Sequence, residues 1–385
     1  MFEDIILTLP FFVTFFWAIT LWIGAKKKEL PKKILALFMT ASALLYASHA
    51  VYFAKGYQLN IIVDPIYALC NLSVFPLYYI YIKSLTQEKS ISRASLLVFL
   101  PAIVLSLSSA ILFVVMSNHE VNNFIHGYLY KEVPITTYST LLKLQISIHY
   151  IERVTFALLL VPCTYFSWKH IFEYEKKIRE FYSTTENRSL NWTVNLLIAT
   201  IITAVFAFIL NTVGKSFFVD DFSLLIIPSL FFSALLYTIG YLGTAQAFSI
   251  EDYKKDLLGD KFVKNISNYN VVKNKLQAQI TRLLEEDQIF RNCDLRITDI
   301  SRTLNTNRTY ISNIINTDFN CSFCDLINHY RVNYSKQLLL HQNAYILEYV
   351  SNESGFASVN SFLRAFKKET GITPGQFRKQ LQNSK

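Results

Sequence analysis

Seven long apolar segments occupy the first 245 residues of this 385-residue chain. An α-helix needs about 20 predominantly apolar residues to cross the hydrocarbon core of a bilayer. Hydrophobic residues make up 52% of the chain and the mean hydropathy is +0.28, both above the values usual for a water-soluble protein. We therefore expect a helical membrane domain with spans at Ile5–Ile23, Ile34–Phe53, Ile61–Ile82, Leu96–Met116, Ile146–Trp168, Val194–Leu210 and Phe222–Ala245.

The loops between these segments differ in charge. Loops one, three and five carry thirteen Lys and Arg residues, whereas the loops on the other side carry four. Because positively charged loops stay in the cytoplasm, the N-terminus is predicted to lie outside and the C-terminus inside, in the inner membrane of a bacterium. The first residues lack the positive region and the cleavage site of a signal peptide, so we expect no cleaved leader.

The five cysteines provide no disulfide framework. Cys321 and Cys324 form a C-x-x-C pair, but no second ligand pair stands at zinc spacing. We expect these thiols to be structural and predict no metal site and no cofactor.

A helix-turn-helix pattern lies near the end of the chain, in the run GFASVNSFLRAFKKETGITPGQFRK at residues 355–379. Gly355 stands in the turn, where a positive φ angle is needed, and Ser358 is a good N-cap for the next helix. The helix would bury one stripe and leave its other face free to enter a DNA major groove. The stripe consists of Phe362, Ala365 and Phe366.

An earlier part of the chain repeats this pattern. Asn305 stands in the corresponding turn and tolerates a positive φ angle, and Asn307 is the corresponding N-cap. A long helix at about 323–340 is expected to hold the two units rigidly. Both second helices would then reach successive major grooves, about 34 Å apart, on one face of DNA. The matching buried stripe consists of Ile311, Ile314 and Ile315.

The two units carry the residue pattern of a known family. In the second unit the pattern is present at Gly355, Phe356, Ser358, Phe362, Phe366, Lys367, Lys368, Gly371, Thr373, Pro374, Phe377 and Arg378. In the first unit it is present at Leu295, Ile300, Leu304, Ile311, Ser312, Phe323, Ile327, Asn328, Tyr330 and Arg331. On these residues, positions 271 to 382 resemble the DNA-binding domain of the AraC/XylS family. The departures are Ser301 and Ser351, where the family usually has Ala, and Asn305, where it often has Gly.

The layout as a whole resembles membrane-bound members of that family, in which a multi-span domain replaces the sensing portion. We therefore expect an all-α chain with three parts: a seven-helix transmembrane domain at 1–248, a linker helix at 249–270 and an AraC-type domain at 271–385. The helix-turn-helix units are expected at about 295–316 and 346–368. The linker has two interpretations, a helix lying on its neighbour or on the membrane surface, and a dimerising helix that relays a signal.

The resemblance implies which side chains face DNA. Arg364 suits a bidentate pair with guanine, whereas Asn313 or Asn360 suits adenine. Leu363 or Val359 suits a thymine methyl group. The full set expected to read bases is Thr309, Ser312, Asn313, Val359, Asn360, Leu363 and Arg364. The set expected to contact phosphates is Arg308, Tyr310, Ser361, Lys367 and Lys368.

Other residues of the same domain are expected to be structural. Arg331 lies inside the connecting helix and is interpreted as the partner of a buried carboxylate or carbonyl group. Phe323 and Tyr330 are interpreted as core residues. For any single Lys or Arg in the domain, the alternative to a DNA contact is a solvated surface charge.

Ionisable residues inside membrane spans are costly and often mark functional sites. Asp64, His149, Glu152 and Arg153 lie in or near the predicted outer ends of spans three and five. They are candidates for a pocket that binds a small polar signal molecule. The alternative is that they are polar ties between helices or interface residues. The outer loop Ser117–Gln145 is long for a connector and is a second candidate site.

Together these patterns predict a membrane-anchored, sequence-specific DNA-binding transcription regulator. Neither half contains a P-loop, a G-x-S-x-G, an H-E-x-x-H or a kinase motif, so we expect no enzyme. The alternatives are a transporter or intramembrane enzyme with a regulatory DNA-binding tail, and a passive tether of DNA. The partners expected are double-stranded DNA, membrane lipid, RNA polymerase, a small-molecule or lipid signal, and a second copy of the chain.

Overall fold

The computed structural model forms two compact units. The first comprises Met1–Phe172 and Leu190–Gln246, and the second comprises Glu173–Ser189 and Ala247–Lys385. Within the residues that the structure describes, the secondary structure is helical and contains no β-strand, which confirms the predicted all-α class. The structure describes residues 2–25, 29–87, 93–186, 188, 198, 201, 202, 205, 209, 223–245, 250–258, 269–341 and 345–383.

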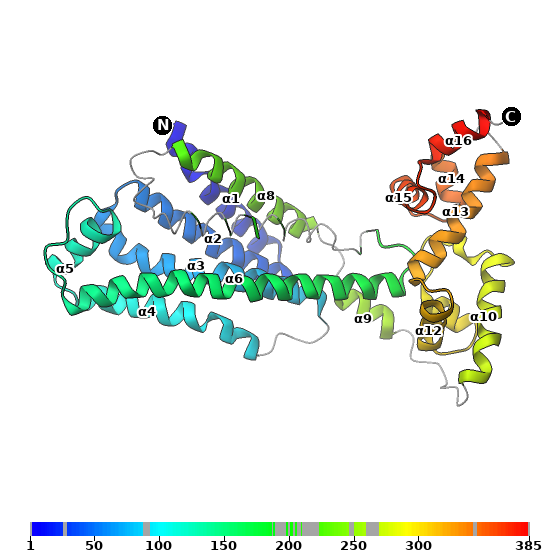
Figure 1. Cartoon of the computed structure of the whole chain (residues 1–385), viewed down its shortest axis with the longest axis horizontal. Coiled ribbons are helices and arrows are strands. Elements are labelled where there is room, and N and C mark those ends of the chain that lie inside the picture. The colour runs from blue at the N-terminus through cyan, green and yellow to red at the C-terminus, as the bar shows by residue number, and fades with distance from the viewer. Residues whose placement is uncertain are drawn as a thin grey trace. The chain divides into compact units, whose positions relative to one another are not determined.

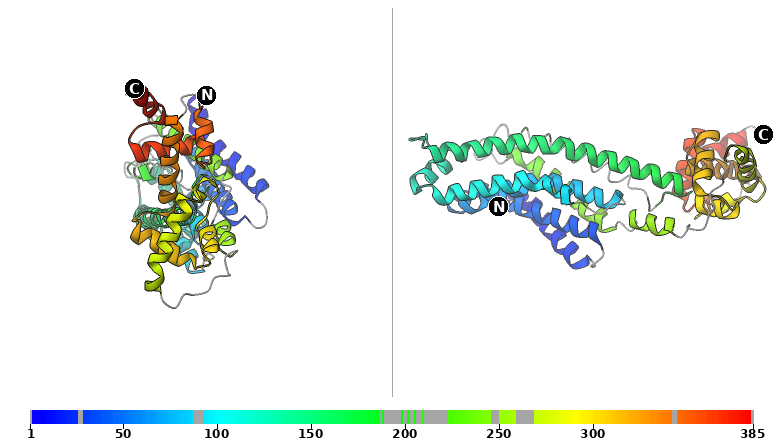
Figure 2. Two further views of the ribbon diagram at one scale, coloured as in Figure 1. Left: turned by 90° about the vertical axis from the view of Figure 1, so that its right-hand side faces the viewer. Right: turned by 90° about the horizontal axis from the view of Figure 1, so that it is seen from below.

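Six helices in the described residues are long and apolar enough to cross a membrane. They match six of the seven predicted spans, and in the first unit they run side by side (Figures 1 and 2). The remaining predicted span, Val194–Leu210, lies almost entirely outside the described residues. The six are α1 (Phe2–Gly24), α2 (Leu30–Phe53), α3 (Asn60–Thr86), α4 (Leu100–Val115), α6 (Thr140–Phe181) and α8 (Ser223–Ala245).

Small residues let the helices of the first unit approach closely. A Cβ atom added at Gly240 of α8 would lie 2.3 Å from the ring of Trp17 on α1. One added at Gly243 would lie 2.2 Å from the side chain of Leu35 on α2. Such close backbone approach is typical of helix packing in lipid, where apolar burial alone does not drive association. The two glycines therefore fix α8 against α1 and α2.

The outward faces of these helices are apolar. Val114 is 85% exposed, Ile23 82% and Ile227 77%, and many other large apolar side chains of the same helices are exposed with them. In water such a surface would be unfavourable and would promote aggregation. A helix pairs most of its backbone polar groups internally, as a lipid environment requires. The surface of the first unit is thus compatible with membrane insertion.

Helix α6 is longer than its apolar segment. The fifth span was expected to end at Trp168, but the helix continues to Phe181. Its last part carries charged residues, yet Tyr174, Ile178 and Phe181 are fully buried within the second unit. Their spacing of four and three residues places them on one helix face. A helix of 42 residues is about 63 Å long, which exceeds the hydrocarbon core of about 30 Å.

The predicted outer loop after α4 is folded rather than extended. It contains α5 (Asn118–Asn122) and a short π-helical segment, η3 (Asn123–Leu129). Tyr130, which follows η3, stacks on Tyr52 of α2 with ring centroids 4.6 Å apart. Its hydroxyl also accepts a hydrogen bond of 2.9 Å from the side chain of Asn60. These contacts fasten the loop to α2 and α3.

The second unit holds the helix-turn-helix region. A central helix, α13, packs against helices from both sides of it in the chain, namely α12, α14, α15 and α16. The predicted connecting helix at about 323–340 is therefore confirmed. The helices of this unit after α6 are α9 (Ile250–Leu258), α10 (Tyr269–Glu285), η5 (Ile289–Arg291), α11 (Ile297–Thr303), α12 (Arg308–Asp318), α13 (Phe323–His341), α14 (Leu347–Glu353), α15 (Val359–Thr370) and α16 (Pro374–Asn383).

Replacing Gly240 with Ala is expected to destabilise the first unit by about 1–3 kcal/mol, because the new methyl group would overlap the Trp17 ring. Thermal unfolding of the full chain in detergent, followed by tryptophan fluorescence, measures the effect. Gly24→Ala is the matched control, since a Cβ atom there meets nothing within 4 Å. Equal melting temperatures for the two variants would contradict the proposed packing.

Candidate nucleic-acid interface

Both helix-turn-helix units have the turn and cap geometry that the sequence predicts. Asn305 has a φ angle of +46° and Gly355 one of +83°, so both turns use the left-handed region. The side chain of Asn307 accepts a hydrogen bond of 2.9 Å from the amide of Thr309. The hydroxyl of Ser358 accepts one of 3.2 Å from the amide of Ser361. These caps define where α12 and α15 begin.

The buried stripes are also confirmed. On α12, Ile311, Ile314 and Ile315 are at most 1% exposed. On α15, Phe362 and Phe366 are fully buried, and Ala365 packs against the same core. Burial of one stripe fixes the rotation of each helix about its axis, so the opposite face is turned to solvent.

The residues expected to read bases lie on the solvent side of the two second helices. Thr309 and Asn313 of α12 are exposed, and Ser312 is half-buried. On α15, Asn360 and Arg364 are exposed, whereas Val359 and Leu363 are half-buried. The three residues on α12 and the four on α15 all lie in the first turns of their helices. In this motif, that part of the helix reaches the base edges.

The residues expected to contact phosphates have more varied surroundings. Lys367 is exposed and Tyr310 is half-buried. The hydroxyl of Ser361 donates to the carbonyl oxygen of Ser358 at 2.8 Å and accepts from its amide at 3.2 Å. That hydroxyl therefore closes a capping box. The guanidinium of Arg308 lies over the ring of Phe181, 5.7 Å from its centroid.

Lys368, the remaining member of that set, belongs to a charged network around Asp325. Its ammonium group donates to Asp325 Oδ1 at 2.8 Å, and Arg179 Nη2 donates to both carboxylate oxygens at 2.6 and 2.8 Å. Burial would raise the pKa of Asp325, but the hydrogen bonds from Lys368 and Ser322 and the charge of Arg179 lower it below its usual value. Asp325 is thus ionised and links α6, α13 and α15.

Among the residues that the structure describes, Arg331 is the largest of the fully buried side chains, at 1% exposed. Its guanidinium donates to the carbonyl oxygens of Phe290 and Asn292, both at 2.8 Å. Burial lowers the pKa of Arg331 to about 10. The predicted structural role, binding a buried carbonyl group, is confirmed. Phe323 is buried as predicted, whereas Tyr330 is only half-buried.

Residues 182–186, which follow α6, form a docked segment within the second unit, and no sequence pattern predicted it. The amide of Ser183 donates to the carbonyl oxygen of Leu295 at 3.0 Å. The guanidinium of Arg331 donates to the hydroxyls of Ser183 and Thr184 at 3.1 and 3.2 Å. The carboxylate of Glu186 accepts from the hydroxyl of Ser358. A polar run after a membrane span is typical of an ordinary loop, and its residues do not indicate which distant residues they contact.

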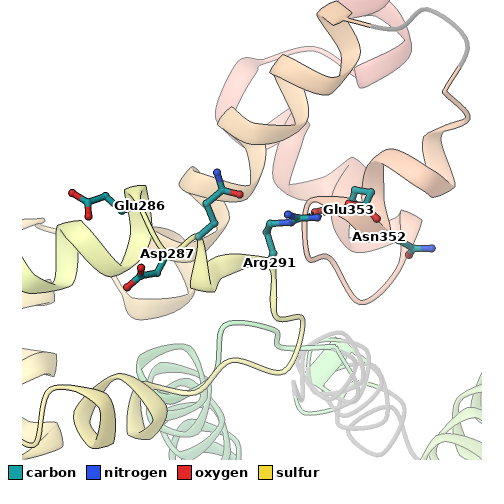
Figure 3. A pocket seen from close by; sticks show the side chains of 6 residues that line it. Glu286, Asp287, Arg291, Asn352 and Glu353 are labelled. Atoms are coloured by element: carbon teal, nitrogen blue, oxygen red, sulfur yellow. Dashed lines mark hydrogen bonds and ion pairs between the residues drawn. The ribbon is translucent and has the colours of Figure 1, made fainter.

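An ion pair next to the second turn joins η5 to α14. Arg291 Nη2 donates to Glu353 Oε2 at 2.5 Å, and its Nε donates to the Glu353 carbonyl oxygen at 3.1 Å. In Figure 3 the side chain of Arg291 points toward Glu353, and both residues line one depression on the surface. Its lining also includes the acidic residues Glu286 and Asp287. Because acidic residues repel the DNA backbone, this depression does not belong to the proposed interface.

In the first unit the structure brings together part of the predicted signal pocket. Asp64 on α3 and His149 on α6 are hydrogen-bonded at 3.0 Å. Glu152, one turn further along α6, is 5% exposed. Arg153 lies over the ring of Tyr150, 5.7 Å from its centroid, so the neighbours Glu152 and Arg153 face different surroundings. Among the described residues, no group of three or more His, Cys, Asp or Glu side chains is placed to hold a metal ion.

Comparison with known proteins finds one family model, a helix-turn-helix domain, that matches residues 300–380. The Msm operon regulatory protein of Streptococcus mutans is 30% identical over 149 residues, which are 39% of this chain and 49% of that protein. The uncharacterized HTH-type transcriptional regulator YtdP of Bacillus subtilis is 30% identical over 90 residues, 23% of this chain and 12% of that protein. The chain thus spans less than half the length of these curated relatives.

Two solved structures are also similar. One is a protein of unknown function from Listeria innocua, 29% identical, covering 27% of this chain and 94% of that one with a TM-score of 0.24. The other is the C-terminal domain of the two-component response regulator yesN from Fusobacterium nucleatum, 26% identical, covering 28% and 97% with a TM-score of 0.24. The family match confirms that residues 300–380 form an AraC-type helix-turn-helix domain.

Replacing Gly355 with Ala is expected to destabilise the second unit by about 2–4 kcal/mol, through left-handed strain and steric overlap. The new Cβ atom would lie 2.5 Å from the carbonyl oxygen of Phe290. Gly371→Ala is the control: its φ angle is +81° but nothing lies within 4 Å, so only the strain of about 1 kcal/mol remains. Hydrogen exchange of α14 and α15 in the full chain measures both. Equal losses of protection would show that the close approach is unimportant.

Proposed function

We propose that this chain is a membrane-anchored transcription regulator that binds a specific DNA sequence through two helix-turn-helix units. The observation that carries the proposal is the paired geometry of α12 and α15. Each is capped at its N-terminus, buried along one stripe and polar on the opposite face. The part of the chain that the structure describes contains six helices suited to a membrane, which supports anchoring. The similar proteins named as regulators agree with a role in transcription.

In this proposal, α15 supplies the stronger base contacts. Arg364 would form two parallel hydrogen bonds with a guanine, and Asn360 would pair with an adenine. Val359 and Leu363 would lie against thymine methyl groups. On α12, Asn313 would pair with adenine, and Thr309 and Ser312 would form single hydrogen bonds. Lys367 would contact a phosphate and position the helix without reading sequence.

The first unit would sense a signal and report it to the second. The charge of its loops supports an external N-terminus and a cytoplasmic second unit, where DNA is present. The Asp64–His149 pair lies near the N-terminal end of α3, which the proposed topology puts outside. A small polar molecule that competes for either side chain would change the packing of α3 against α6.

Replacing Arg364 with Ala is expected to weaken binding to the preferred duplex by about 1–3 kcal/mol and to relax the preference at one position. Fluorescence anisotropy of the full chain with preferred and scrambled duplexes measures this. Lys367→Ala is the matched control on the same helix. It should weaken both duplexes equally and reduce the salt dependence by about one phosphate contact. A uniform loss for Arg364→Ala would exclude base reading by that residue.

The proposed topology makes a separate prediction. A reporter fused after Arg179 is expected to be active only as a cytoplasmic protein, because loop five carries many positive charges. A reporter fused at Asn123 is expected to behave as an external protein. Paired enzymatic reporters, each active on one side of the membrane, provide the measurement. The opposite pattern would place the helix-turn-helix domain away from DNA and end the proposal.

A further inference from the structure

The docked segment, residues 182–186, contacts both helix-turn-helix units. Near the first helix-turn-helix unit, Tyr182 pairs with Arg296 in a single antiparallel β-bridge. The amide of Ser183 donates to the carbonyl oxygen of Leu295, just before α11. Near the second helix-turn-helix unit, the hydroxyl of Ser358 donates its one proton to the carboxylate of Glu186, whose two oxygens lie 2.7 and 2.8 Å away. The segment therefore bridges the two halves of the DNA-binding domain from within the same compact unit.

Glu186 lies where an anion is most favourable. Ser358 is the N-cap of α15, a helix of 12 residues, and the N-terminus of a helix carries a partial positive charge. In the helix-turn-helix motif the start of the reading helix comes close to the DNA backbone, and backbone phosphates bind readily at helix N-termini. The Ser358 hydroxyl already accepts the Ser361 amide and has one proton to donate. Glu186 and a phosphate would require that same proton.

We propose that residues 182–186 are an intramolecular ligand of the DNA-binding domain, in which Glu186 occupies the position of a DNA phosphate at the start of α15. This inference rests on the proposed DNA-binding function. It assigns a partner to the N-terminal surface of α15, namely a segment of the same chain. Binding of DNA requires Glu186 to leave, so the docked segment lowers the affinity of the full chain for its site.

Neighbouring residues of α6 engage two other groups expected to contact phosphates. The ring of Phe181 lies against Arg308, and Arg179 shares the carboxylate of Asp325 with Lys368. The end of α6 and the docked segment thus hold donors on both α12 and α15. Because Glu186 is an anion and the DNA backbone is an anion, the two compete directly for this surface. The competition is reciprocal: bound DNA weakens the hold on Glu186 to the same extent.

The test uses the full chain in lipid nanodiscs and a duplex selected from a random pool by the full chain or its variants. Glu186→Gln removes the charge and keeps the shape, and Glu186→Ala removes the contact. Both are expected to tighten binding up to about fivefold, which corresponds to the loss of one partly exposed charged contact. Glu180→Gln is the matched control. Glu180 lies at the end of α6 and pairs with Lys176 at 4.0 Å, and its substitution makes the same change in net charge.

The outcomes separate the two proposals. If no form of the chain selects a duplex, the proposed function fails and this inference falls with it. If the chain selects a duplex but Glu186→Gln and Glu186→Ala bind it no tighter than Glu180→Gln does, DNA binding stands and the docked segment is not a competitor. Tightening by the two Glu186 variants alone supports the inference.

A second measurement follows Glu186 itself. Carboxyl groups of the wild-type chain can be labelled with a carbodiimide and an amine, and the labelled positions found by mass spectrometry. Glu186 is half-buried, so its labelling is expected to increase several-fold when saturating duplex displaces it, whereas that of Glu180 stays constant. Unchanged or reduced labelling of Glu186 with DNA bound would overturn the competition.

Discussion

The buried guanidinium of Arg331 is the constraint around which the second unit is organised. A buried charge is strongly destabilising unless hydrogen bonds replace its water. Its partners among the described residues are carbonyl and hydroxyl oxygens from two separate stretches, residues 183–184 and 290–292. Both stretches must therefore stay in contact with the guanidinium of Arg331. Phe290, one of the carbonyl partners, and its neighbour Arg291 leave no room for a side chain at Gly355, so the turn of the second helix-turn-helix depends on the same arrangement.

Local features of the second unit could be predicted because they follow from local sterics. A positive φ angle needs Gly or Asn, an N-cap needs a short polar side chain, and a buried stripe needs apolar residues at helical spacing. Positions 305, 307, 355 and 358 satisfy these rules directly. The connecting helix followed from the same periodicity. Six helices of the first unit could also be predicted, because length and apolarity suffice to identify a candidate membrane span.

Contacts between residues distant in sequence could not be predicted. Arg179 and Asp325 are 146 positions apart, and Glu186 and Ser358 are 172 apart. Periodicity indicates that a residue is buried or exposed but does not identify its partner. The charged residues after Trp168 suggested the end of a span and a cytoplasmic loop. In the structure the helix continues instead, because Tyr174, Ile178 and Phe181 are buried in the core of the second unit.

The docked segment has two parts that differ in how firmly they are held. Ser183 and Thr184 bond to a buried charge, and removing them would leave Arg331 without several of its partners, at a cost of several kcal/mol. Glu186 and the Arg179–Asp325 pair are partly exposed, where a charged contact contributes about 1 kcal/mol or less after screening. A ligand or a movement of α6 that supplies about 1.4 kcal/mol changes an equilibrium tenfold. Such a signal is too weak to break the hydrogen bonds of Ser183 and Thr184 to Arg331, but it is sufficient to break the contact between Glu186 and Ser358. The permanent part would then keep the chain docked while the exchangeable part gives way to DNA.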